Sequence, residues 1–165
     1  MKMKNSLILL TIFMCATSTI AQKSKFSVFP NFGVTKPILD GGLGFHAGVN
    51  PSYKLSNRFA LEGQVSYSYT DISSAFLSGK RGSVSAGNFL TGGRLYLNPN
   101  SKKSIFYLNL LAGLNVIKEK SEGLDLGTEY GFGFSTGGFV NLSGLTLGIT
   151  YDTPQNLVLK LGLSL

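Results

Sequence analysis

Residues 156–165 (N-L-V-L-K-L-G-L-S-L) constrain the fold more than any other stretch of the chain. Side chains of a strand point alternately to its two faces. Leucine at every second position from Leu157 to Leu165 therefore predicts a strand with one wholly apolar face. Lys160 lies in the middle of the opposite face. Two environments accept such a strand: a soluble sheet with a core side and a water side, or a membrane barrel with a lipid side and a polar interior.

The start of the chain has the layout of a secretory signal peptide. Lys2 and Lys4 precede an apolar stretch at residues 7–14, and Ala21 offers a small residue for cleavage. The only cysteine, Cys15, lies in this segment. We therefore expect a signal peptide at residues 1–21 and one mature domain at residues 22–165, without disulfides or cysteine-based metal sites.

The charge balance of the mature domain is mildly basic. The chain has 15 Lys and Arg residues and 8 Asp and Glu residues, and only Lys2 and Lys4 of these fall in the predicted signal peptide. The basic residues are scattered, with no dense patch interleaved with aromatic residues. This distribution does not support nucleic-acid binding.

Alternation of apolar and polar residues predicts an all-β domain of eight strands. The expected strands are residues 25–35, 43–55, 58–70, 84–97, 104–117, 128–140, 145–151 and 156–165. Most are longer than the roughly 5–6 residues of an ordinary globular strand. They match the roughly 9–11 residues that cross a bilayer. The connections after the first, third and fifth strands, at residues 36–42, 71–83 and 118–127, are longer than those after the even-numbered strands, at 56–57, 98–103 and 141–144. Outer-membrane barrels have this alternation of longer loops and short turns, and the connection at 152–155 is the one exception because it is short.

Two further features favour the membrane barrel over the soluble one. Aromatic residues collect near the predicted strand ends, as in the interfacial girdles of membrane barrels. They are Phe26, Tyr53, Phe59, Tyr96, Phe106 and Phe139 near the turns, and Phe45, Tyr67, Tyr69, Tyr130, Phe132 and Tyr151 near the loops. The ionisable residues His46, Glu62, Arg94 and Lys160 all fall on the polar face, away from the predicted lipid. A soluble barrel would have to pack the many apolar side chains into a narrow lumen.

The whole mature chain resembles the small outer-membrane β-barrel proteins of Gram-negative bacteria, which include the transmembrane domain of outer membrane protein A and outer membrane protein X. The resemblance rests on the signal peptide, the eight amphipathic strands and glycine-rich segments such as residues 131–138. Members of this porin-like family usually end in an aromatic residue, whereas this chain ends in Leu165. The resemblance implies an up-and-down transmembrane barrel in the outer membrane, inserted by the barrel-insertion machinery.

Four charged residues are the candidates for a specific role. Glu62 and Arg94 lie near the turn ends of adjacent predicted strands and point inward, which predicts a buried ion pair. An eight-stranded lumen is filled by its own side chains, so we expect no general pore. Lys80 and Arg81 lie in the predicted loop at residues 71–83, where they are candidates for binding lipopolysaccharide phosphates.

The expected function is a structural or surface-interaction role without enzyme activity, cofactor or metal. His46 is the only histidine, and Asp71, Ser73 and Ser74 in the next predicted loop show no motif that links them to it. The expected partners are outer-membrane lipid, lipopolysaccharide and the insertion machinery, with no nucleic acid, and the expected state is a monomer. Two alternatives stay open: a lipid-modifying outer-membrane enzyme, and a soluble periplasmic or secreted barrel that binds a small apolar ligand.

Overall fold

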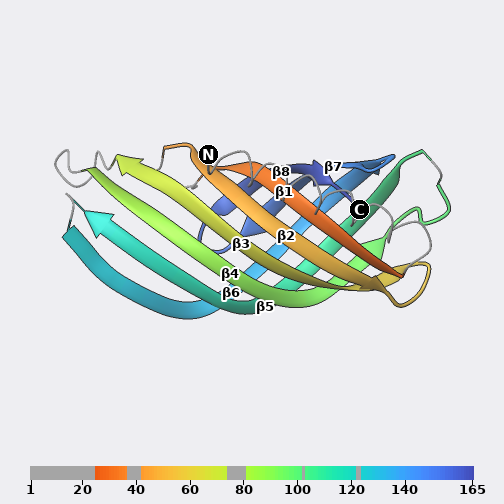
Figure 1. The fold of residues 1–165 in the computed structure, drawn as a ribbon, viewed down its shortest axis with the longest axis horizontal. Coiled ribbons are helices and arrows are strands. Elements are labelled where there is room, and N and C mark those ends of the chain that lie inside the picture. Colours follow the sequence, from red (N-terminus) through yellow and green to blue (C-terminus); the bar gives the residue numbers. More distant parts are fainter. Residues whose placement is uncertain (1–24, 37–41, 74–80, 102, 122–123) are drawn as a thin grey trace, which may run out of the picture.

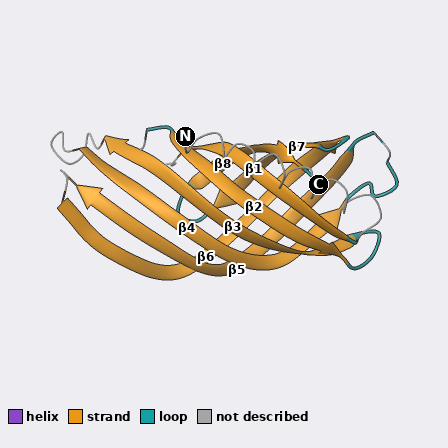
Figure 2. Ribbon diagram, viewed as in Figure 1, coloured by secondary structure: helices purple, strands orange, loops and turns teal. Residues whose placement is uncertain are grey.

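The computed structural model describes residues 25–36, 42–73, 81–101, 103–121 and 124–165. Within these residues the chain forms a closed antiparallel barrel, in which each strand pairs with the next and the last pairs with the first (Figure 1). The strands are β1 (Phe26–Lys36), β2 (Gly44–Lys54), β3 (Phe59–Ser73), β4 (Arg81–Tyr96), β5 (Ile105–Ser121), β6 (Leu124–Leu142), β7 (Leu145–Asp152) and β8 (Asn156–Leu163). Figure 2 shows these strands joined by loops and turns.

The predicted all-β, eight-stranded antiparallel barrel is therefore confirmed. None of the described residues belongs to a helix long and apolar enough to cross a membrane. The predicted signal peptide at residues 1–21 lies outside the described residues and stays a prediction.

The side chains of β8 show which side of the wall is apolar. Leu157, Leu159, Leu161 and Leu163 are 39%, 55%, 49% and 44% exposed, whereas Lys160 is 2% exposed. The other strands have the same orientation, with most apolar side chains outside and the polar side chains inside, and a few apolar side chains such as Phe29, Tyr107 and Phe139 are buried. A soluble barrel that binds an apolar ligand needs the reverse orientation, so that alternative is wrong for this fold.

Two glycines allow the first and last strands to close the barrel. Gly33 of β1 lies opposite Lys160 of β8, and Gly162 of β8 lies opposite Asn31 of β1. A Cβ atom at Gly162 would overlap the carbonyl oxygen of Pro30, and one at Gly33 would overlap the carbonyl oxygen of Leu159. Only glycine lets the backbones approach this closely.

The strands differ more in length than the sequence predicts. β3, β4, β5 and β6 have 15, 16, 17 and 19 residues, whereas β7 and β8 have 8 each. The predicted loop at residues 118–127 is wrong in large part, because β5 continues to Ser121 and β6 already begins at Leu124. The predicted loop at 71–83 also loses residues to β3 and β4.

These additional strand residues lie where the hydrophobic alternation ends. The first nine residues of β6 are exposed on both faces, and β6 pairs with β7 only from Ser135 onward. Figure 1 accordingly shows β4, β5 and β6 reaching well past β7 and β8. Backbone pairing continues in this extension although neither face is buried, so the period of two no longer separates an inner from an outer face.

Candidate functional site: the barrel interior

Glu62 of β3 and Arg94 of β4 form an ion pair inside the barrel. Arg94 Nε donates to Glu62 Oε2 at 2.7 Å, and the two side chains are 4% and 0% exposed, respectively. The pair is diagonal in the ladder, because Glu62 lies opposite Gly92 and Arg94 lies opposite Ala60. Gly92 has no side chain, so the Arg94 side chain meets the carboxylate without competition at that position.

Neighbouring strands supply the remaining hydrogen bonds of the Glu62 carboxylate. Asn50 of β2 donates to Glu62 Oε1 at 2.8 Å, and Asn109 of β5 donates to the same oxygen at 3.4 Å. Asn31 of β1 donates in turn to Asn50 Oδ1 at 2.9 Å. A buried charge is costly unless it is paired and hydrogen-bonded. The network meets that requirement for the Glu62 carboxylate and ties together five consecutive strands.

A second buried ion pair joins β7 to β8. Lys160 Nζ donates to Asp152 Oδ2 at 2.7 Å, and both side chains are fully buried. Ser135 of β6 donates to Asp152 Oδ1 at 2.6 Å. Residues 152–155 were predicted to be a turn, so the Asp152–Lys160 pair is a finding of the structure alone. The signal was available, since Asp152 follows Thr150 in the inward phase of β7.

Gln64 of β3 connects the two ion pairs. Its Oε1 accepts from Lys160 Nζ at 3.2 Å and from Asn50 Nδ2 at 3.4 Å, and its Nε2 donates to Asp152 Oδ2 at 3.3 Å. Asn50 also donates to Glu62, so one hydrogen-bonded network extends from the Glu62 pair to the Asp152 pair. This network fills the middle of the lumen.

Aromatic rings close the lumen at the end that carries the β4–β5 turn. Tyr107 and Phe139 stack with ring centroids 4.8 Å apart, and Phe29 meets Phe139 edge-on at 6.0 Å. The Arg94 guanidinium lies over the Tyr107 ring at 4.3 Å from its centroid. The sequence predicted an interior filled by polar side chains. The structure corrects this prediction, because an aromatic cluster occupies part of the interior. The assignment of Phe139 to the outer aromatic girdle is also wrong, because Phe139 is 4% exposed and shares the inward phase of Ser135.

Tyr96 belongs to the same interior group rather than to the outer girdle. It packs against the buried aromatic cluster, with its ring 5.8 Å from that of Tyr107. Tyr96 follows Arg94 by two residues and therefore shares its inward phase on β4. The girdle at this end of the barrel is correspondingly smaller than predicted.

The β7–β8 turn is hydrogen-bonded across the other end of the lumen. Asn88 of β4 donates to Gln155 Oε1 at 3.2 Å, and Asn115 of β5 donates to the carbonyl oxygen of Thr153 at 3.4 Å. Asn115 also donates to Asn88 Oδ1 at 2.6 Å. Since β4 and β5 lie across the barrel from β7 and β8, these bonds hold the turn over the lumen.

His46 of β2 is buried inside the barrel. It is 1% exposed, and its Nδ1 lies 2.9 Å from the hydroxyl oxygen of Ser68 on β3. Asp71 instead accepts a hydrogen bond from the Tyr69 hydroxyl at 2.7 Å on the exposed side of β3. Ser74 lies outside the described residues. Among the residues that the structure describes, no three His, Cys, Asp or Glu side chains are grouped to hold a metal ion.

For the two loop candidates, the structure describes only the backbone of Arg81. Lys80 lies outside the described residues, and Arg81 is the first residue of β4, with its backbone opposite Ser73. Their role in binding stays a prediction.

Comparisons with known proteins agree with the fold. No protein-family model and no curated protein matches the chain. Among solved structures, the fold is similar to that of Ail, the attachment invasion locus protein of Yersinia pestis, in complex with the heparin analogue sucrose octasulfate (TM-score 0.51, 14% identity, covering 86% of this chain and 97% of that one). This is the fold of a small outer-membrane β-barrel.

Two further solved structures have lower scores. The N-terminal β-barrel domain of Pseudomonas aeruginosa OprF gives a TM-score of 0.47 at 12% identity, covering 87% of this chain and 98% of that one. The outer membrane enzyme PagL gives 0.42 at 16% identity, covering 84% and 96%. At these identities the likeness concerns the fold and not the activity.

Proposed function

We propose that the protein is an integral outer-membrane β-barrel with a structural or surface-interaction role, and neither a general pore nor an enzyme. The observation that carries the proposal is a continuous apolar outer wall around a lumen obstructed at both ends. The leucines of β7 and β8 face outward. The Tyr107–Phe139 stack and the Gln155 turn obstruct the two ends of the lumen. An apolar exterior around a polar centre suits a barrel that has lipid as its solvent.

Heat modifiability and conductance together test this proposal. Outer membranes that contain the protein are run on a detergent gel before and after boiling, and the purified barrel is placed in a planar bilayer. We expect a shift in mobility on boiling, because a closed barrel resists detergent, and no steady conductance. A soluble protein without a shift would overturn the membrane assignment, whereas a stable open channel would overturn the sealed lumen alone.

Surface interaction would involve the strand extension and its loops. Lys118 and Lys120 are exposed on β5, and Lys118 Nζ forms an ion pair with Asp125 Oδ2 at 2.7 Å. Together with Lys80 and Arg81, they would meet lipopolysaccharide phosphates. Binding of the Lys80→Ala/Arg81→Ala double variant to lipopolysaccharide vesicles tests this role. Unchanged binding and unchanged salt dependence would contradict it.

We also propose that the protein is a monomer and that the barrel-insertion machinery assembles it. The mass of the detergent-solubilised protein would test the monomer.

The His46–Ser68 contact is the one observation that favours the enzyme alternative. Both side chains are 1% exposed and belong to the filled lumen, so a lipid substrate has no access to them. We therefore propose a structural role for the pair. Loss of lipid A modification in a His46→Ala strain whose barrel remains folded would overturn this assignment.

A further inference from the structure

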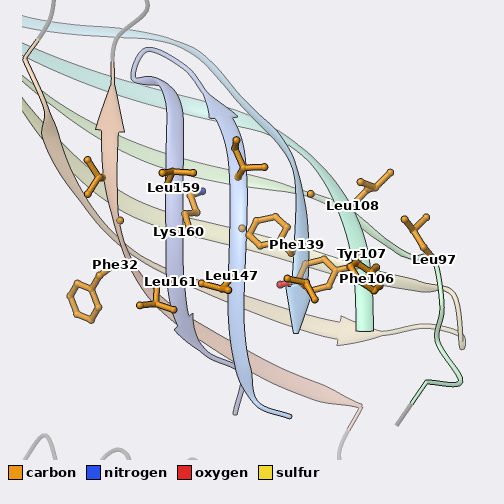
Figure 3. Close-up of a pocket in the computed structure, with 16 residues that line it drawn as sticks. Phe32, Leu97, Phe106, Tyr107, Leu108, Phe139, Leu147, Leu159, Lys160 and Leu161 are labelled. Atoms are coloured by element: carbon orange, nitrogen blue, oxygen red, sulfur yellow. The ribbon is translucent and has the colours of Figure 1, made fainter. Parts of the chain in front are cut away.

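The outer wall is hollowed on the side formed by β1, β8, β7, β6 and β5. The hollow has a volume of about 870 Å³, within the range of roughly 300–1,000 Å³ typical of small-molecule sites. Figure 3 shows Leu147, Leu159 and Leu161 in the groove, between Phe32 at one end and Phe106 at the other. We call this hollow the outer groove.

The strand register explains the shape of the outer groove. Five outward residues lie side by side across the five strands and form a first row: Phe32, Leu161, Leu147, Val140 and Phe106. A second row lies next to it: Val34, Leu159, Ile149, Gly138 and Leu108. The first row has a phenylalanine at each end and shorter aliphatic side chains between them. The second row lacks a side chain at Gly138.

The gap at Gly138 is not required by the backbone. A Cβ atom there would have Leu108 Cδ2 as its nearest neighbour, at an ordinary contact distance of 3.6 Å. The two flanking rings stand out from the wall, since Phe32 is 70% exposed and Phe106 is 47% exposed. The groove is therefore an open trough between two rings, with a glycine in its floor.

From this geometry we propose that the outer groove binds the acyl chain of a membrane phospholipid and holds it longer than the smooth parts of the wall do. The proposal rests on the proposed function, because the groove continues the lipid-facing surface. In a bilayer its contents are hydrocarbon, and a groove left empty would lose dispersion contacts along its lining. Lys160 also lines the groove, but its ammonium group does not reach the groove surface, since it is buried inside the barrel against Asp152.

The orientation of the rows suits a chain that descends into the bilayer. Strands of such barrels tilt by roughly 35–45° from the membrane normal. Rows that run across the strands are then inclined as well, so a flexible chain can follow them between the two rings.

The test uses vesicles of phosphatidylethanolamine and phosphatidylglycerol with a trace of phosphatidylcholine that is spin-labelled on one acyl chain. Electron paramagnetic resonance then measures how much motionally restricted lipid each barrel holds. Gly138→Leu fills the groove. Gly63→Leu is the matched control, because Gly63 lies on the outward face of β3, outside the groove, and a Cβ there has a comparable nearest contact, Pro51 Cγ at 3.5 Å.

We expect Gly138→Leu to hold less restricted lipid per barrel than the wild type, and Gly63→Leu to match the wild type. Equal amounts in all three proteins would overturn the acyl-chain site. A change in oligomeric state in Gly138→Leu alone would show a second copy as the occupant and would also overturn it. Heat modifiability of each sample separates these outcomes from failure of the proposed function, in which the wild type itself would not insert.

Discussion

Lys160 and Asp152 meet at 2.7 Å inside the barrel, eight residues apart in sequence and on the two strands of the final hairpin. Their side chains are fully buried, so each charge depends on the other and on Gln64 and Ser135. One polar network inside the lumen connects this pair, on β7 and β8, to the Glu62–Arg94 pair on β3 and β4. The lumen is consequently a core, with hydrogen bonds in place of much of the apolar packing of a soluble protein.

Lys160→Met should destabilise the barrel, because it leaves the Asp152 carboxylate buried without its cation. Removing one partner of a buried pair typically costs about 3–5 kcal/mol of unfolding free energy. Urea unfolding in phospholipid vesicles measures the loss. The double variant Lys160→Met/Asp152→Asn is the control, and we expect it to recover part of the loss. A double variant as unstable as the sum of its single variants would contradict the pairing.

Glu62→Ala should lower the unfolding free energy of the barrel by about 3–5 kcal/mol, because Arg94 loses its buried counter-charge. The midpoint of urea unfolding falls accordingly. Planar-bilayer conductance of the same variant is the second readout. We expect it to stay closed, since the Tyr107–Phe139 stack and the Gln155 turn still obstruct the lumen. Unchanged stability with altered conductance would instead indicate that the Glu62–Arg94 pair gates a channel.

Gly162→Ala should destabilise the seam between β1 and β8, because the new methyl group would overlap the Pro30 carbonyl oxygen. Overpacking of this kind costs roughly 1–3 kcal/mol. Gly138→Ala is the matched control on the open outer wall, and we expect it to unfold at the wild-type urea concentration. If both variants unfold alike, the close approach at the seam does not limit stability.

Leu159→Arg should destabilise the inserted barrel more than Leu163→Arg does. Both leucines face outward, but Leu159 lies in the middle of β8 and Leu163 at its end. Arginine on the lipid face costs roughly 2–4 kcal/mol at the midplane and about 0–1 near the interface. Unfolding from vesicles compares the two variants. A larger effect at Leu163 would reverse the expected depth of β8 in the bilayer.

Within the apolar belt, the period of two in the sequence predicts which face each strand residue occupies. A period of two assigns every side chain to one of two faces, and it correctly placed the leucines of β8 outside and His46, Glu62, Arg94 and Lys160 inside. The same period also assigns Tyr96 and Phe139 to the inward face. Those two were assigned to the girdle because they are aromatic and near a strand end, although their phase is inward.

Strand length beyond the apolar belt was not predictable in the same way. Half of residues 118–127 are charged (Lys118, Glu119, Lys120, Glu122 and Asp125), so this stretch was interpreted as a loop. In the structure residues 118–121 pair with residues 124–128, with a bulge between Glu119 and Lys120. Backbone hydrogen bonds extend the ladder there without any requirement on the side chains.

The sequence by itself therefore determined the all-β class, the eight strands and the inward or outward direction of their side chains, because each depends on local alternation. Only the tertiary structure decided which residues of distant strands come together on each face. Gln155 reaches Asn88, 67 positions away, and Phe32 lies in one row with Phe106. These relationships depend on register and on closure of β1 against β8, which bring strands distant in the chain around to face one another.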